Sequence, residues 1–243
     1  MKLRDQRVLV TGATAGIGQE TAKLFARRGA SVIITGRDTE RGAQTVAAIE
    51  AEGGRAEFIA ADLNDIESVR RLAEQAGEVD VLVNNAGAHT FGPTLEQDVD
   101  SFDMTFHVDV RAPFFLTAAL VPKMIARGSG AIVNISTMGA SVGVPFAPVA
   151  AAAKAALESL TRSWAAAFGA NGIRVNTVAP GPTRTDSAVG LLGDGAEQRG
   201  SATLLGRTAD PSEIAEAIVF LASPQASYLT GATVAVDGGY TAI

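Results

Sequence analysis

The chain has 243 residues, 47% of them hydrophobic and 19% charged, with a net charge of −6 at pH 7 and no cysteine. These values predict a globular protein whose core needs no disulfide, exclude thiolate zinc sites and cysteine nucleophiles, and fit a reducing cytoplasm. Charges of both signs are scattered and no apolar run approaches the ~18 residues of a membrane span, so we expect neither nucleic-acid nor membrane binding.

Apolar, β-rich runs alternate with segments of helical periodicity along the chain. Residues 1–7 lead directly into the first run, so we expect no signal peptide. Strands are predicted at 8–10, 31–35, 57–60, 79–83, 131–135, 173–178 and 232–236. Helices are predicted at about 19–26, 39–52, 66–77, 99–126 and 149–168, and again from Pro211, where Asp210 can cap the first turn.

This alternation predicts one doubly wound (Rossmann) α/β domain over residues 1–243, in which helices cover both faces of a parallel sheet. No Pro/Gly/Ser-rich linker and no repeat divides the chain. Ligands bind such sheets beyond the carboxyl ends of the strands, so the turns that follow the strands form the candidate functional site.

The first of these turns, Thr11–Gly18, is rich in glycine. Gly12 can turn the chain sharply, Gly16 lets the backbone approach a ligand, and Gly18 lets the next helix pack closely on its strand. The unpaired N–H groups at the start of that helix favour an anion such as a pyrophosphate. The turn therefore predicts a nucleotide site.

The turn after the second strand is Gly36-Arg37-Asp38. An acidic residue here would favour NAD(H), whereas the guanidinium of Arg37 can pair with the 2′-phosphate of NADP(H). We therefore expect NADP(H) to be favoured over NAD(H), although Ala15 supplies no second basic group. An exposed loop arginine is the alternative.

The later turns allow two interpretations each. Asp62, after the third strand, can accept from an adenine amino group or cap a helix. The amides of residues 84–87 can bind a ribose or tie neighbouring strands together. The stiff turn at 179–185 carries hydroxyls that can hold a carboxamide.

Four motifs occur in a specific order and spacing: TGxxxGxG at 11–18, NNAG at 84–87, IRVNxxxPG at 173–181 and the closing segment 229–239. Over essentially its whole length the chain resembles the short-chain dehydrogenase/reductase family. The resemblance implies reversible hydride transfer between a nicotinamide and a small carbonyl or alcohol substrate. It also implies the following cofactor-binding residues: Gly12, Thr14, Gly16, Ile17, Gly18, Arg37, Asp62, Leu63, Asn85, Ala86, Gly87, Lys154, Pro180, Gly181, Thr183 and Thr185.

In the family a tyrosine gives a proton to the developing alkoxide, helped by a lysine four residues later, a serine and an asparagine. Lys154 matches the lysine, but Ala150 stands at the tyrosine position, Thr137 at the serine position and Asp109 at the asparagine position. Threonine keeps a hydroxyl, whereas aspartate adds a charge that can pair with Lys154. Alanine removes the proton donor, which typically costs about 10²–10⁴-fold in rate, so we expect a poor catalyst.

Two explanations of Ala150 stay open. The alanine can be an engineered knock-out of a working reductase. Alternatively, the chain can be a naturally non-catalytic NADP(H)-binding sensor, scaffold or partner subunit, which Thr137 and Asp109 favour modestly. Tyr228 and Tyr240 do not align with the missing tyrosine.

The remaining expectations concern the surroundings of this site. By resemblance, residues 186–203 form a short, mobile lid over the substrate; its leucines and valine predict a neutral, moderately apolar ketone or secondary alcohol. Ser136 should point away from the site if the fifth strand continues. His89 and His107 have no third ligand nearby in sequence, so no metal site is expected. The alanine-rich run 150–156 predicts close helix packing and, by resemblance, a homotetramer or dimer.

Overall fold

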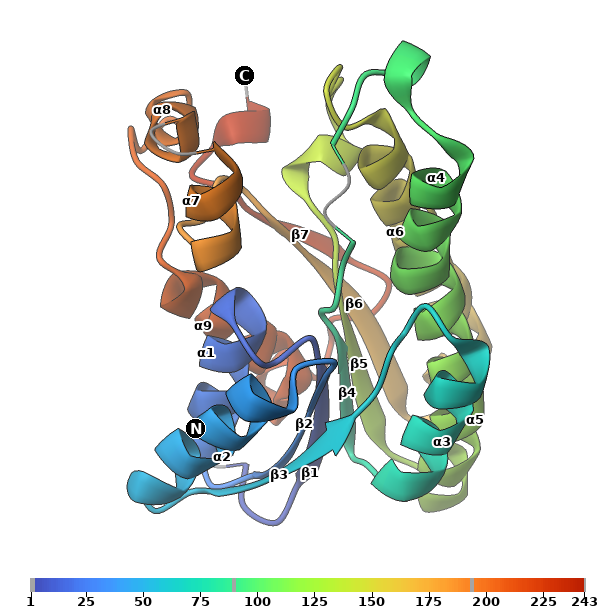
Figure 1. The fold of residues 1–243 in the computed structure, drawn as a ribbon. Coiled ribbons are helices and arrows are strands. Elements are labelled where there is room, and N and C mark those ends of the chain that lie inside the picture. Colours follow the sequence, from blue (N-terminus) through green and yellow to red (C-terminus); the bar gives the residue numbers. More distant parts are fainter. Residues whose placement is uncertain (1–2, 89–90, 193–194, 243) are drawn as a thin grey trace.

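Parallel strands form one continuous sheet through the centre of the molecule (Figure 1). The computed structural model describes residues 3–88, 91–192 and 195–242. Over these residues the sheet has seven strands in the order β3-β2-β1-β4-β5-β6-β7, all paired in parallel. The strands are β1 (Arg7–Thr11), β2 (Ser31–Gly36), β3 (Arg55–Ala60), β4 (Val81–Asn84), β5 (Gly130–Ile135), β6 (Ile173–Pro180) and β7 (Thr233–Val236). The predicted doubly wound domain is therefore confirmed.

Helices cover both faces of the sheet (Figure 1). One face carries α1 (Gly16–Arg27), α2 (Thr39–Ala51) and α9 (Pro211–Ala222). The other carries α3 (Ile66–Ala76), α4 (Val99–Phe106), α5 (Ala112–Arg127) and α6 (Pro148–Phe168). No helix in the described part of the chain is long and apolar enough to cross a membrane.

The apolar strands are buried on both faces because neighbouring side chains of a strand point to opposite sides. Val8 and Val10 of β1 belong to the core under α1 and α9, whereas Leu9 belongs to the core under α3 and α5. Each face of the sheet thus has its own layer of core, and the carboxyl ends of the strands stay open to a ligand.

One predicted helix differs from the structure. The single helix expected over 99–126 is divided into α4 and α5 by a π-helical turn at His107–Arg111. Such a turn inserts extra backbone without changing the apolar pattern enough to be seen in the sequence. The lid expected over 186–203 contains two short helices, α7 (Asp186–Leu192) and α8 (Gly195–Ser201).

Candidate active site

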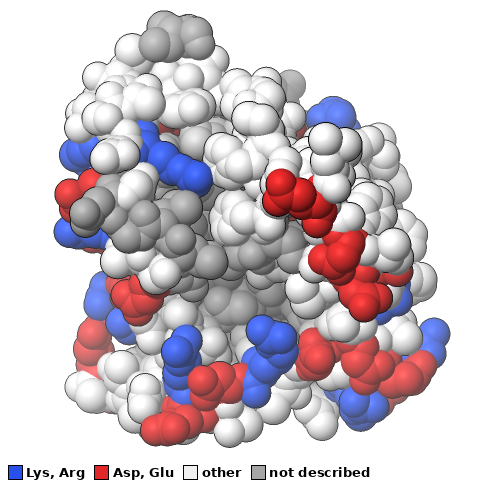
Figure 2. Space-filling view, turned by 45° about the horizontal axis from the view of Figure 1, so that its top comes forward, with Lys and Arg blue, Asp and Glu red and all other residues white. Residues whose placement is uncertain are grey.

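A cavity of about 740 Å³ lies at the carboxyl ends of the strands, within the range of about 300–1,000 Å³ that is typical of ligand sites. Figure 2 looks onto this end of the molecule, with basic side chains at the lower centre and acidic ones gathered on the right. The cavity is lined by every residue that the sequence assigned to cofactor binding and by all four residues at the predicted catalytic positions. Most of them lie at the ends of six strands or on the turns that follow, whereas Asp109, Ala150 and Lys154 reach the cavity from helical segments.

Three glycines of the first turn occupy positions that exclude a side chain. Gly12 and Gly16 have φ values of +64° and +55°, which other residues rarely adopt. A Cβ on Gly18 would lie 2.4 Å from the carbonyl oxygen of Gly12. At the start of α1, the N-cap residue Ala15 forms no side-chain cap, so the first N–H groups of the helix are left for another acceptor.

Hydrogen bonds tie the end of β4 to the first turn. The Nδ2 of Asn85 donates to the carbonyl oxygens of Thr11 (2.8 Å) and Gly12 (3.1 Å), and the Thr11 hydroxyl accepts from the backbone N–H groups of Asn85 and Ala86, both at 3.0 Å. The sequence left open whether this amide binds a ribose or ties neighbouring strands together, and in the structure it ties β4 to the turn after β1. The wall of the cavity is therefore held rigidly.

A second, buried chain of amides positions α6. The Nδ2 of Asn84 donates to Oδ1 of Asn134 (2.8 Å), whose own Nδ2 donates to the hydroxyl of Thr161 (2.7 Å). Thr161 lies on α6, two turns after Lys154. Strands β4 and β5 thereby fix the helix that carries this lysine.

The polar groups at the third and sixth strand ends also have local partners. Oδ1 of Asp62 accepts from the N–H of Asn64 (3.0 Å), the hydroxyl of Thr183 donates to the carbonyl oxygen of Gly181 (3.0 Å), and the Thr185 hydroxyl accepts from Ala188 N–H at the start of α7 (3.1 Å). These bonds shape the turns while both threonines still line the cavity.

The turn at Gly181 packs against Asp237, because a Cβ at Gly181 would lie 2.5 Å from the Asp237 Cα. Burial raises the pKa of Asp237, but hydrogen bonds from Thr241 and Gly239 outweigh it, so the pKa is lowered overall. The ionised carboxylate thus anchors the segment after β7 beneath this part of the cavity.

Lys154 and Asp109 form an ion pair inside the cavity wall, with 3.4 Å between Nζ and Oδ2. Asp109 lies on the π-helical turn and is 1% exposed, and its Oδ1 accepts from the N–H of Ala88 at 2.8 Å. Gly87 leaves the space beside the pair, since a Cβ there would lie 3.4 Å from the Lys154 Nζ. The lysine charge is therefore balanced by the protein itself.

Ala150 and Thr137 line the cavity beside this pair. Ala150 lies in α6 one turn before Lys154 and presents only a methyl group. The hydroxyl of Thr137 accepts from the N–H of Gly139 at 3.2 Å and keeps its proton to donate. Neither Tyr228, which is fully exposed, nor Tyr240 lines the cavity.

The orientation expected of Ser136 assumed that the fifth strand continues, and its hydroxyl bonds to Glu158, a residue that does not line the cavity. Strand β5 ends at Ile135, so the strict alternation stops before Ser136, and both Ser136 and Thr137 line the cavity. The Ser136 hydroxyl donates to Oε1 of Glu158 on α6 at 2.6 Å. This bond adds a further tie between β5 and the lysine helix.

Two basic residues of the cavity were missed from the sequence. Arg41, in the first turns of α2, lines the cavity together with Arg37, and its Nε lies 3.3 Å from Oδ2 of Asp38. Its place in the first turn of the helix that follows β2 is the signal that could have indicated this. Arg199, on α8, also lines the cavity.

Among the described residues, which include His107, no group of three His, Cys, Asp or Glu side chains gathers. The Nδ1 of His107 lies 3.0 Å from Oδ1 of Asn64, and His89 lies outside the described residues.

Comparison with known proteins identifies the family. Residues 12–241 match the family model described as enoyl-(acyl carrier protein) reductase. A solved structure of a short chain dehydrogenase/reductase family protein is 53% identical, covers 99% of this chain and 100% of its own, and superposes with a TM-score of 0.94. The chain belongs to the short-chain dehydrogenase/reductase family.

Two other members of this family are similar over almost the whole chain. Cis-4-hydroxycyclohexanecarboxylate dehydrogenase of Sinomonas cyclohexanicum is 44% identical and covers 98% of both chains. The structure of a gluconate 5-dehydrogenase from Burkholderia cenocepacia, in complex with NADP and tartrate, is 31% identical, covers 100% of this chain and 97% of its own, and has a TM-score of 0.92. The named members are dehydrogenases, which places this chain among the oxidoreductases.

Proposed function

We propose that this chain is an NADP(H)-dependent oxidoreductase that interconverts a ketone and a secondary alcohol, in a form whose catalysis is impaired by Ala150. The observation that supports it is one cavity that combines the glycine turn of β1, the basic residues after β2 and the Lys154–Asp109 pair. The secondary alcohol in the name of the Sinomonas cyclohexanicum relative supports the substrate class.

The cavity fits a dinucleotide at its phosphate end. Gly12, Gly16 and Gly18 leave a surface without side chains beside the uncapped start of α1, which suits a pyrophosphate. Arg37 and Arg41 together provide the cationic site that a 2′-phosphate requires. This second arginine strengthens the expected preference for NADP(H), which the NADP bound in the gluconate 5-dehydrogenase structure also supports.

The residues around Ala150 support both the proposed reaction and the proposed impairment. When bound, the nicotinamide would supply or accept the hydride. Thr137 would donate a hydrogen bond from its hydroxyl to the substrate oxygen. Lys154, near Thr137 in the cavity wall, would help to orient the nicotinamide cofactor. No side chain at position 150 can give the oxygen a proton, so a water molecule must do so at a lower rate.

The surroundings of the site lead to two further proposals. We infer that α7 and α8 form the substrate lid over residues 186–203. We also infer a homo-oligomer, a tetramer or dimer, because α4, α5 and α6 expose an apolar groove that includes Phe114 and Phe115, which are 42% and 43% exposed.

The deciding experiment titrates the chain with NADPH and with NADH and then measures turnover after Ala150→Tyr. We expect NADPH to bind more tightly than NADH, and Ala150→Tyr to increase oxidation of NADPH with cyclic and aliphatic ketones at least about 10²-fold. Ala152→Tyr, at an exposed position of the same helix, is the matched control and should give no increase. No saturable binding of either nucleotide would refute the proposal.

The second candidate is a naturally non-catalytic NADP(H)-binding sensor, scaffold or partner subunit. The buried Lys154–Asp109 pair favours it, because its mutual neutralisation weakens the field that a catalytic phenol would need. Tight NADPH binding with no turnover before or after Ala150→Tyr would support this candidate.

A further inference from the structure

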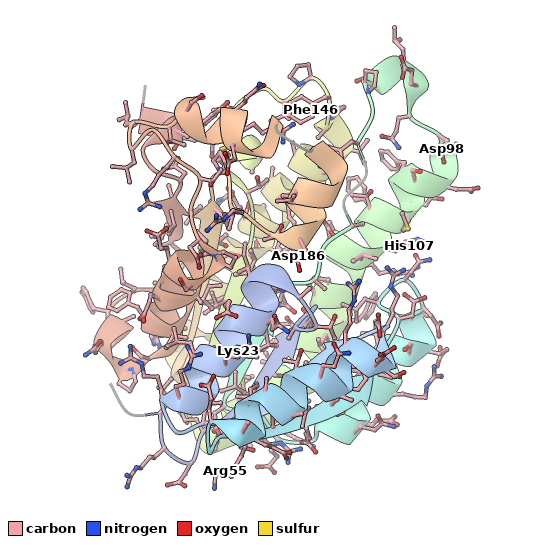
Figure 3. All side chains as sticks on the ribbon, turned by 60° about the vertical axis from the view of Figure 1, so that its left-hand side comes forward. Lys23, Arg55, Asp98, His107, Phe146 and Asp186 are labelled. Carbon is pink, nitrogen blue, oxygen red and sulfur yellow. The ribbon has the colours of Figure 1, made fainter. Side chains whose placement is uncertain are left out.

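Arg199 lies at the cavity on α8, inside the proposed lid. Its guanidinium carbon is 4.4 Å from the ring centroid of Phe146, and that ring stacks on Phe91 with 6.2 Å between centroids. In Figure 3, Phe146 is labelled beside the two helices of the lid, with Asp186 at the start of α7. A guanidinium over an aromatic ring can still donate hydrogen bonds from its N–H edge to a ligand.

This arginine belongs to the substrate end of the cavity. Phe146 lies on the segment between β5 and α6, four residues before Ala150, whereas Arg37 and Arg41 follow β2. Strands β1 and β4 lie between β2 and β5 in the sheet. Arg199, over Phe146, therefore lies toward one end of the cavity, and Arg37 and Arg41 lie toward the other. Arg199 is thus placed away from the proposed 2′-phosphate site.

Beside Thr137 and the Lys154–Asp109 pair, the cavity wall around this end is lined by apolar residues: Phe91, Met104, Val108, Met138, Val144 and Phe146. Among the described residues, no carboxylate lies within ion-pair distance of Arg199. The one acid nearby in the cavity lining, Asp109, is already paired with Lys154. A half-buried cation beside apolar walls gains most from an anion supplied by the ligand.

We propose that Arg199 is a specificity-determining residue that binds a carboxylate on the substrate. This inference rests on the proposed function and narrows its substrate class to compact, apolar hydroxy- or oxo-carboxylates, in which the reacting carbon and the carboxylate lie at opposite ends of the molecule. It replaces the sequence-based expectation of a neutral substrate, which considered only the leucines and valine of the lid. The apolar body then lies against the aromatic pair while the guanidinium takes the charge.

The test compares two probes of similar shape, cyclohexanecarboxylate and uncharged cyclohexanecarboxamide, by calorimetric titration with and without saturating NADP⁺. We expect the carboxylate to bind at least about tenfold more tightly than the amide, as a charge-assisted bidentate contact provides. Arg199→Gln should remove this ratio, and Arg199→Lys, which keeps the charge but loses the planar fork, should keep part of it. Arg184→Gln is the matched control, because Arg184 is exposed and pairs with Asp210 at 3.7 Å outside the cavity lining.

Two results would overturn the proposal: equal or undetectable binding of the two probes by the parent chain, or an unchanged ratio in Arg199→Gln. If Arg199→Gln with an unchanged ratio also loses NADP⁺ affinity, the arginine is assigned to a cofactor phosphate. Thermal unfolding of each variant checks that it is folded. Failure of NADP⁺ to bind the parent chain would instead refute the proposed function, and the titrations without cofactor still decide the role of Arg199.

Discussion

Lys154 and Asp109 hold opposite charges 3.4 Å apart beside a position that carries only a methyl group. A positive lysine would favour ionisation of a phenol at position 150, but the adjacent carboxylate opposes this effect. The sequence could predict this pairing because the two positions align with neighbouring catalytic residues of the family. It could not predict that Asp109 is held in place by Ala88 N–H, since that bond depends on the π-helical turn.

We therefore expect Asp109→Asn, made in the Ala150→Tyr form, to raise kcat/KM for ketone reduction about 3–10-fold, the effect of roughly one pKa unit on proton transfer. The alkaline limb of the pH–rate profile should move to lower pH, because the unbalanced lysine charge stabilises the introduced phenolate. Asp103→Asn, on the exposed face of α4, changes the same charge outside the cavity and should leave kcat/KM unaltered. A fall in kcat/KM with the profile unmoved would show that Asp109 helps rather than hinders.

Among the elements, α9 shows how far local sequence signals reach. The Asp210-Pro211 start predicted from sequence is present as a capping box: Oδ1 of Asp210 accepts from Ser212 N–H (3.0 Å), and Oε2 of Glu213 accepts from Asp210 N–H (2.9 Å). Such signals are local and can be predicted. The π-helical turn between α4 and α5 cannot, because its effect on Asp109 arises from packing against residues far away in sequence.

The ionisation of Glu213 makes the stability of this capping box depend on pH. A hydrogen bond from Arg207, at 2.7 Å, and the cap bond from Asp210 lower the pKa of Glu213 from 4.5 to about 2. Because the folded-state pKa is depressed, the stabilisation is present above about pH 4.5 and is lost as the pH falls toward about 2.

Glu213→Gln should thus lower the Tm at pH 7 and have progressively less effect below pH 4.5. The side chains of Arg207 and Glu213 are 55% and 42% exposed, so solvent screens their ion pair. We therefore expect the free energy of unfolding at pH 7 to fall by about 0.5–1 kcal/mol and the Tm by about 1–4 °C in a protein of this size. Calorimetric scans between pH 2.5 and 7 test this, with Glu74→Gln, an exposed residue of α3, as the control. A Tm difference that is constant over this pH range would contradict the assigned ion pair.

At the scale of the whole molecule, the alternation of apolar runs was enough to predict the sheet, its helical layers and the edge at which the site lies. The residues at that edge were found because parallel strands bring their carboxyl ends together, whatever their separation in sequence. Arg41 and Arg199 were missed because neither directly follows a strand: Arg41 reaches the cavity from α2, and Arg199 from α8, where its guanidinium lies over the Phe146 ring. The sequence therefore predicted the site residues that the order of the strands brings together. It did not predict Arg41 and Arg199, whose side chains reach the cavity from a helix.

The joining of distant elements by one side chain is clearest at Arg174. This residue of β6 donates to four backbone carbonyls around the end of α9: its Nη1 to Leu221 (2.6 Å) and Ala226 (3.0 Å), and its Nη2 to Ala222 (3.1 Å) and Ser223 (3.0 Å). Burial lowers the pKa of Arg174, but a guanidinium stays charged at neutral pH. The positive charge also lies where the α9 dipole is negative.

Arg174→Met should consequently destabilise the whole fold, because it leaves the last carbonyls of α9 without donors in a partly buried place. We expect a loss of about 2–4 kcal/mol and a Tm lower by roughly 4–16 °C, with Arg174→Lys intermediate because an ammonium group cannot reach four carbonyls at once. Urea unfolding followed by circular dichroism measures the loss, and Arg162→Met, at an exposed site on α6, provides the control. Amide hydrogen exchange should accelerate in both β6 and α9 if the side chain joins the sheet to this helix. Exchange that increases in α9 alone would mean that Arg174 only caps the helix.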